Sequence, residues 1–150
     1  MRPPMERFFA YGVLNRDLAK GRAAELIAPL DEGQRASTCG ALYALRGGDG
    51  GWYPILLPGE GPVHGLLHDA HGVDWPAMDE FEDARGQPDD EYARREIAVT
   101  LPDGASTTAF AYCYVRPLPA DAESIAGGDF GAWLRDTGRA AFGSRGSSHS

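Results

Sequence analysis

Short apolar runs separated by turn-forming residues dominate the chain and predict more strands than helices. Five or six strands are expected, drawn from residues 7–11, 36–46, 52–57, 62–69, 92–101 and 106–115. The last two segments flank Pro102-Asp103-Gly104, and an Asp-Gly turn between two alternating runs is typical of a β-hairpin. Pro54 has no backbone N–H, so its strand is expected at an edge or an end of the sheet.

Three other segments have the spacing of helices. Asn15 is a favourable N-cap for a helix expected from residue 16 to 26, and apolar positions predict further helices over residues 73–82 and around residues 130–136. Together with the strands, these helices indicate an α+β domain with a mostly antiparallel sheet.

The domain is expected to cover residues 1–142, because the sequence contains no repeat and no internal linker. A chain of 150 residues is long enough to bury most of its apolar surface in one core. Residues 143–150, GSRGSSHS, have low complexity and resemble an expression tag, so we expect them to be disordered.

The excess of acidic residues limits the kinds of partner that the chain is expected to bind. The chain has 22 Asp and Glu against 14 Lys and Arg, with a formal net charge of −8. An acidic surface repels phosphate groups, so we expect neither nucleic acid nor membrane as a partner. No apolar run reaches the roughly 18 residues that span a bilayer, and residues 1–12 lack the pattern of a signal peptide. We therefore expect a cytoplasmic protein, as a monomer or a weak homodimer.

Cysteine and histidine do not indicate a metal site. Cys39 and Cys113 are the only cysteines, and we expect both to be small core residues of two strands. His64 and His68 share a face of an extended strand but stand about 13 Å apart, too far for one ion. The sequence also lacks a G-x-S-x-G elbow, a P-loop and a G-x-G-x-x-G.

The carboxylates of the segment 73–82 differ in their position around the expected helix. At about 100° per residue, Glu82 lies on the flank of the apolar face, Glu80 almost opposite, and Asp79 in between. Apolar surroundings raise the pKa of a carboxyl group, which suits a general base that works near neutral pH. A half-exposed acid paired with an arginine such as Arg85 has the same pattern and is the more common arrangement.

The turn after the first strand is a second candidate site. In Phe9-Ala10-Tyr11-Gly12-Val13-Leu14 a strand turns at glycine into a helix start, which leaves several backbone N–H groups without intrahelical partners. Such groups can bind an anion or an oxyanion. An ordinary strand-to-helix turn has the same sequence, so both interpretations stay open on the residues alone.

Six short motifs, in their order and spacing, resemble the γ-glutamylcyclotransferase-like (AIG2-like) family. They are FAYGVL at 9–14, WYP at 52–54, PVHGLLHD at 62–69, MDEFED at 78–83, YARREIAV at 92–99 and AYCYV at 111–115. GGDF at 127–130 resembles the family's terminal G-D-W. The resemblance covers about residues 7–135 and implies a small mixed, mostly antiparallel sheet, curled into a barrel-like core with two or three helices.

The resemblance also implies a reaction. In the family a Tyr-Gly loop presents backbone amides to the γ-glutamyl group, and the glutamate of an L-D-x-x-E-G motif acts as acid and base. Matched by position, the loop is Tyr11, Gly12, Val13 and Leu14, and the glutamate is Glu82. The implied enzyme is a cyclotransferase: the α-amine of a small γ-glutamyl substrate attacks its own γ-amide carbonyl, which releases 5-oxoproline and an amine or amino acid. This reaction needs no metal or organic cofactor.

Three more residues are candidates for the substrate site. Tyr53 and Tyr112 are expected to line the pocket, and Arg94 to pair with a carboxylate of the protein or of the substrate. Phe130 replaces the family's terminal tryptophan, and two positions at the site itself depart from the pattern: Val13 stands where a small hydroxyl residue is usual, and Asp83 replaces the glycine after the glutamate. These two departures at the site favour the alternative, a domain of the same fold that binds a γ-glutamyl group or a similar small acid without turnover.

Overall fold

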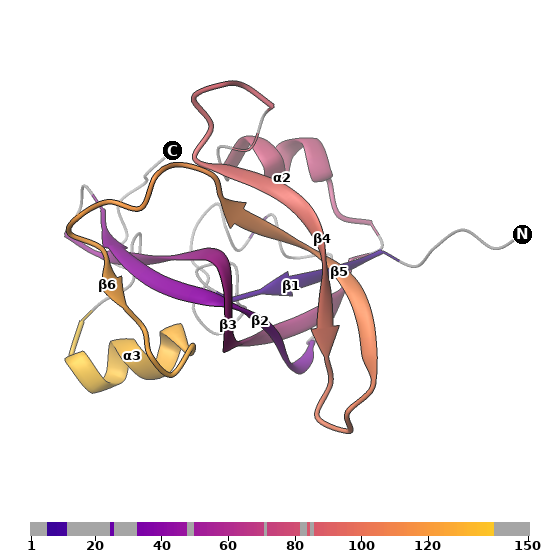
Figure 1. The fold of residues 1–150 in the computed structure, drawn as a ribbon. Helices are drawn as coiled ribbons and strands as arrows, with labels where there is room; N and C mark the ends of the chain where they lie inside the picture. The colour runs from indigo at the N-terminus through magenta and orange to yellow at the C-terminus, as the bar shows by residue number, and fades with distance from the viewer. Residues whose placement is uncertain are drawn as a thin grey trace, which may run out of the picture.

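The computed structural model describes residues 6–11, 25, 33–47, 50–70, 72–81, 84 and 86–139, whose strands form a closed barrel (Figure 1). The strands are β1 (Arg7–Ala10), β2 (Gln34–Arg46), β3 (Trp52–Asp69), β4 (Tyr92–Thr100), β5 (Ser106–Tyr114) and β6 (Glu123–Ser124). The helices are α2 (Trp75–Phe81) and α3 (Phe130–Thr137). The helix expected over residues 16–26 and the tail 143–150 lie outside the described residues, except for Glu25, which is helical.

The barrel consists of two long antiparallel hairpins and the short strand β1. Its strand order is β3-β1-β5-β4-β2, β2 pairs back with β3, and β6 adds to β2. The β2–β3 and β4–β5 pairs run along the strands, whereas β1 and β5 meet only at Phe8–Phe110 and β2 and β4 only at Ser37–Thr100. The β1–β5 pairing is parallel and all others are antiparallel. The expected mixed, mostly antiparallel barrel of the α+β class is confirmed.

Two details of the strands differ from expectation. The prediction of separate strands over residues 52–57 and 62–69 is wrong, because both belong to the 18-residue strand β3. The exposed residues 58–61 between them carry no apolar signal, yet β3 continues past a register shift opposite Gly40 and Ala41. The prediction that both cysteines lie in the core is wrong for Cys39, which is exposed because it points to the outer face of β2.

Two clusters of buried side chains fill the space inside the barrel and beneath α2. The first includes Phe9, Val63 and Val99 from the strands and Phe130 and Leu134 from α3. The second is rich in aromatic residues and contains Phe8, Trp75, Met78, Tyr92, Tyr112 and Tyr114. Successive residues of a strand point to opposite faces, so β1 supplies one phenylalanine to each cluster. The two helices lie far apart, with α2 at the top and α3 at the lower left of Figure 1.

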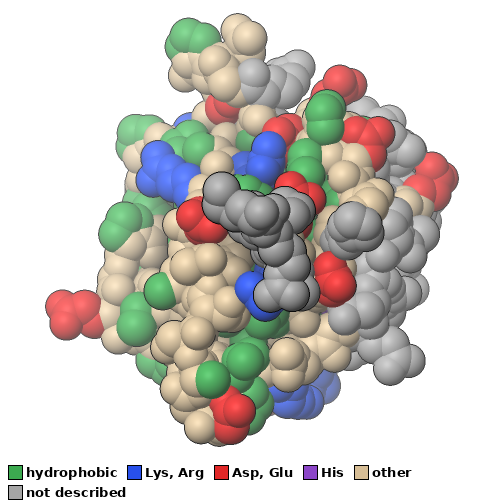
Figure 2. Space-filling view, turned by 90° about the vertical axis from the view of Figure 1, so that its right-hand side faces the viewer, with side chains coloured by type: hydrophobic (Ala, Val, Ile, Leu, Met, Phe, Trp, Pro, Cys, Tyr) green, Lys and Arg blue, Asp and Glu red, His purple; other side chains and the backbone are tan. Residues whose placement is uncertain are grey.

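The last helix confirms the prediction around residues 130–136. Its N-cap is Asp129, whose Oδ1 accepts a hydrogen bond from the Ala132 N–H at 2.9 Å, and it ends at Gly138, which has a φ of 70°. In the part of the chain that the structure describes, no helix is both long and apolar enough to cross a bilayer. The described residues on the face in Figure 2 include interspersed acidic and basic side chains.

Gly128 anchors the segment before α3, and a variant tests its conformation. Its φ is 68°, and its carbonyl accepts a hydrogen bond from the His64 N–H at 2.7 Å. A Cβ at this position would collide with the carbonyl oxygen of Pro62. We expect Gly128→Ala to lower the free energy of unfolding, measured with denaturant, by about 2–4 kcal/mol.

The matched control is Gly127→Ala, since a Cβ at Gly127 meets nothing within 4 Å. We expect a change of less than about 0.5 kcal/mol for this variant. Equal losses in the two variants would contradict the strain assigned to Gly128.

Candidate functional site

The structure describes part of the predicted site. Tyr11, Tyr53, Arg94 and Tyr112 are described, whereas Gly12, Val13, Leu14 and Glu82 lie outside the described residues, as does Asp83. The described side chains of the site come from the end of β1 and from β3, β4 and β5.

Asp79, on α2, is the carboxylate at which two of the predicted site residues meet. Its Oδ1 accepts hydrogen bonds from the Tyr112 hydroxyl at 2.7 Å and from Arg94 Nε at 2.8 Å, while Arg94 Nη2 donates to Oδ2 at 3.3 Å. Arg94 on β4 and Tyr112 on β5 are directly paired in the register of their hairpin, so their side chains share a face. The Arg94 and Asp79 side chains are only 26% and 21% exposed, so the ion pair is largely shielded from water.

Arg94 is also in contact with two aromatic rings. Its Cζ lies 4.6 Å from the ring centroid of Trp75 and 4.8 Å from that of Phe110. A guanidinium stacks well on aromatic faces because it is planar and weakly hydrated. Of the two arrangements that the sequence left open for Arg94, the structure shows the pair with a carboxylate of the protein.

Tyr11 joins this network from the end of β1. Its ring is buried and its hydroxyl donates a hydrogen bond to the backbone carbonyl of Tyr112. Tyr112 thus contacts Tyr11 through its backbone and Asp79 through its side chain. The segments that carry Tyr11 and Asp79 lie far apart in the sequence, and β5 brings them together.

Tyr53 makes a separate polar contact on β3. Its hydroxyl donates a hydrogen bond to Glu91 Oε2 at 2.7 Å. Burial, together with the hydrogen bond and the charge of Glu91, raises the pKa of the Tyr53 phenol above its usual range. Tyr53 is therefore a neutral hydrogen-bond donor at physiological pH.

The six tyrosines of the chain gather in this region. Three belong to the aromatic cluster beneath α2, and Tyr43 and Tyr53 pack against that cluster. The sixth, Tyr11, reaches it through its hydrogen bond to Tyr112. This region is therefore rich in aromatic rings, and four of its six hydroxyls, those of Tyr11, Tyr53, Tyr92 and Tyr112, donate to the protein's own carboxylates and carbonyls.

Residues 86–90, which directly precede Glu91 and β4, are held by a buried acid. Asp90 Oδ2 accepts hydrogen bonds from the backbone N–H groups of Gly86 at 2.6 Å and Gln87 at 3.0 Å. Arg116 Nη2 donates to the backbone carbonyl of Asp89 at 2.6 Å. These contacts hold the start of β4, and with it Glu91, close to Tyr53.

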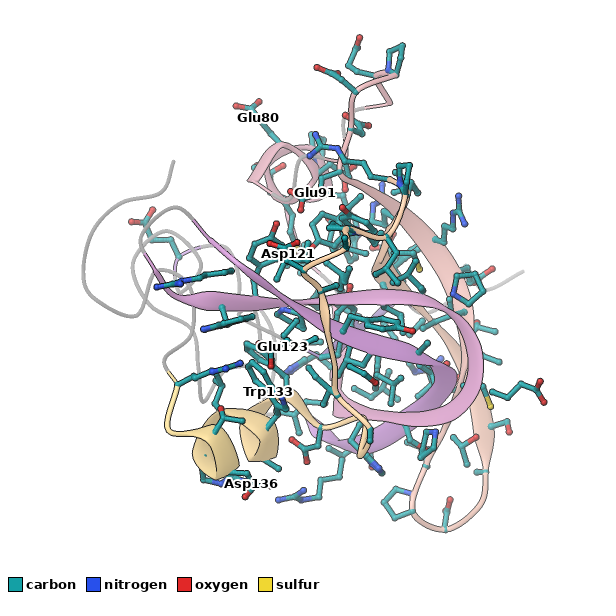
Figure 3. The ribbon with its side chains drawn as sticks, turned by 60° about the vertical axis from the view of Figure 1, so that its left-hand side comes forward. Glu80, Glu91, Asp121, Glu123, Trp133 and Asp136 are labelled. Carbon is teal, nitrogen blue, oxygen red and sulfur yellow. The ribbon has the colours of Figure 1, made fainter. Side chains whose placement is uncertain are left out.

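The helical spacing of α2 correctly predicts that Glu80 is exposed, but it assigns no role to Asp79. Glu80 is exposed as expected, and Figure 3 shows it pointing away from the barrel. Helical spacing predicts an intermediate position for Asp79, because it indicates which way a side chain points and not what the side chain contacts. Its partners come from a hairpin 15 and 33 residues further along the chain. Among the described residues, no group of three or more His, Cys, Asp or Glu is arranged to hold a metal ion.

Comparison with known proteins identifies the family to which the sequence is similar. Residues 8–134 match the sequence family described as Gamma-glutamyl cyclotransferase, AIG2-like. No curated protein matches the chain.

Several solved structures share the fold. The structure of YkqA from Bacillus subtilis has a TM-score of 0.64 at 19% identity and covers 90% of this chain, which spans only 43% of YkqA. An AIG2-like protein from Mus musculus has a TM-score of 0.54 at 24% identity, over 77% of this chain and 80% of that one. Protein ytfP from Escherichia coli has a TM-score of 0.53 at 28% identity, over 83% and 95% of the two chains.

The ion pair of Arg94 generates a stability prediction. In Arg94→Met the half-buried Asp79 carboxylate loses its counter-charge and the aromatic rings lose a cation. We expect the free energy of unfolding to fall by about 2 kcal/mol, measured by denaturant titration.

Arg95→Met is the matched control. Arg95 is the next residue of β4, is exposed, and makes no hydrogen bond or ion pair within the described residues. We expect a change below about 0.5 kcal/mol. A loss in Arg94→Met no larger than in Arg95→Met would show that the pair contributes nothing to stability.

Proposed function

The chain belongs to the gamma-glutamyl cyclotransferase, AIG2-like family, and from this premise we propose that it is a cyclotransferase that cleaves a γ-glutamyl amine or amide and releases 5-oxoproline. The observation that carries the proposal is the extent of the family match. It runs over residues 8–134 and so includes both the Tyr11–Leu14 segment and Glu82.

The reaction needs a base, and Glu82 is the proposed one. The α-ammonium of the substrate is not a nucleophile, so Glu82 first accepts a proton from it. The free amine then attacks the γ-carbonyl carbon, and the new C–N bond closes a five-membered ring. When the tetrahedral intermediate collapses, the bond to the leaving nitrogen breaks and Glu82 returns its proton to that nitrogen. The ring nitrogen also gives up its second proton to the leaving nitrogen, so that the amine departs as an ammonium ion. One γ-glutamyl amide gives 5-oxoproline and one amine, with no water consumed.

The remaining catalytic task is to hold the substrate folded. The nucleophile and the carbonyl belong to one molecule, so the correct orientation supplies much of the rate. The backbone N–H groups of Gly12, Val13 and Leu14 are proposed to bind the substrate carboxylate or the developing oxyanion. A backbone donor does not depend on the side chain, so Val13 in place of a hydroxyl residue preserves it. The rings of Tyr53 and Tyr112 are proposed to line the pocket. This scheme uses no cofactor.

A product assay with paired variants tests the reaction. The protein is incubated with a panel of γ-glutamyl amino acids and γ-glutamyl amines, and 5-oxoproline is measured by mass spectrometry. We expect product from the parent and a loss of at least about 100-fold in Glu82→Gln, because an amide cannot accept the proton. The control is Glu80→Gln, the same substitution at an exposed position of α2, which should retain the parent activity.

Two other results would change the conclusion. Equal product from Glu82→Gln and the parent would remove Glu82 from the proposed role. Absence of product in all three proteins, together with unchanged binding of a γ-glutamyl ligand, would favour the non-catalytic binding domain suggested by Val13 and Asp83.

A further inference from the structure

Tyr112 contacts both chain segments that lead into the proposed active site. Its backbone carbonyl accepts a hydrogen bond from the Tyr11 hydroxyl, and its own hydroxyl donates to Asp79 Oδ1 at 2.7 Å. Tyr11 directly precedes Gly12 in the sequence, and Asp79 precedes Glu82 by three residues. One residue of β5 therefore holds the end of β1 and the helix α2.

Tyr112 is itself firmly held. It is only 3% exposed and is paired with Arg94 near the open end of the β4–β5 hairpin. Its ring packs edge-on against Phe8 of β1, with ring centroids 5.9 Å apart, and Phe8 packs in the same way against Trp75 of α2. Aromatic contacts thus join the same three elements that the hydrogen bonds join.

The orientation of α2 depends on these contacts. A helix of seven residues is too short to be stable by itself, so its tertiary partners determine how it lies. Apolar packing of Met78 and Trp75 favours burial but is weakly directional. The Asp79 carboxylate adds direction, because both of its oxygens accept hydrogen bonds from β4 and β5 side chains.

We propose that Tyr112 and Asp79 are positioning residues, which set the orientation of α2 and thereby the point at which the chain continues into Glu82. This inference rests on the proposed function, in which Glu82 is the base. The Tyr112 hydroxyl serves Asp79 and not the substrate. A misplacement of a catalytic group by about 1 Å can cost on the order of 100-fold in rate, so such positioning has a large kinetic effect.

Two variants that each lack one hydroxyl group test the two hydrogen bonds of Tyr112 separately. Tyr112→Phe removes the donor to Asp79 but keeps the ring and the carbonyl that accepts from Tyr11. On the γ-glutamyl compound that the parent turns over best, we expect kcat to fall at least about tenfold with KM within about twofold. Tyr11→Phe releases the segment after β1 and should raise KM instead.

Tyr114→Phe is the matched control. Tyr114 lies two residues further on β5, on the same face, is 7% exposed, and its hydroxyl makes no hydrogen bond within the described residues. Both kcat and KM should match the parent. A fall in kcat as large in Tyr114→Phe as in Tyr112→Phe would overturn the proposal.

Amide hydrogen exchange gives a second readout that does not need catalysis. We expect Tyr112→Phe to raise exchange in residues 77–84 by about tenfold, and Tyr114→Phe to leave it unchanged. Unchanged exchange in Tyr112→Phe overturns the proposal even if kcat falls, because the hydroxyl would then act on the substrate. Raised exchange with unchanged kcat overturns it as well. If the parent is inactive, the proposed function fails, and the exchange result alone decides whether Tyr112 holds α2.

Discussion

The Asp79 carboxylate is the polar group on which the arrangement of α2 and the barrel depends. A charged group at an aromatic interface is costly unless it is paired and hydrogen-bonded. Here Arg94 and Tyr112 supply both, and Trp75 and Phe110 surround the arginine in turn. Because both partners of Asp79 are fixed on the β4–β5 hairpin, these directional hydrogen bonds restrict the orientation of α2 more than apolar burial alone would.

The Asp79 contact lies beside one of the two junctions at which neighbouring strands of the barrel share a single residue pair. The strands β1 and β5 meet only at the pair Phe8–Phe110, so few backbone hydrogen bonds close the barrel there. Trp75 of α2 packs edge-on against both phenylalanines, at centroid distances of 5.9 and 5.3 Å. The helix therefore covers the narrow β1–β5 junction, and the Asp79 network holds it in place. The helix that covers this junction is thus also the helix that the proposed base, Glu82, follows in the sequence.

Local signals in the sequence predicted most of the fold, and the failures have physical reasons. The Asp103-Gly104 turn and the alternating runs beside it located the β4–β5 hairpin, and apolar spacing located α2 and α3. The continuity of β3 was missed because residues 58–61 are exposed and extended only through pairing with β2. The outward position of Cys39 was missed because the small residues around it give no contrast in hydropathy. The role of Asp79 was missed for a different reason. Its partners lie on β4 and β5, and the spacing of residues along α2 does not indicate contacts with a hairpin further along the chain.

Most tyrosine hydroxyls near the proposed site already donate hydrogen bonds to groups of the protein. Tyr11 and Tyr92 donate to backbone carbonyls, while Tyr53 and Tyr112 donate to carboxylates of the protein. These four hydroxyls are thus directed into the fold, whereas those of Tyr43 and Tyr114 make no hydrogen bond within the described residues. Under the proposed function, backbone N–H groups and the base supply the polar recognition of the γ-glutamyl group. Because these groups follow directly on Tyr11 and on α2 in the sequence, the hydrogen bonds that Tyr112 makes with Tyr11 and Asp79 hold the two described segments from which the proposed site continues.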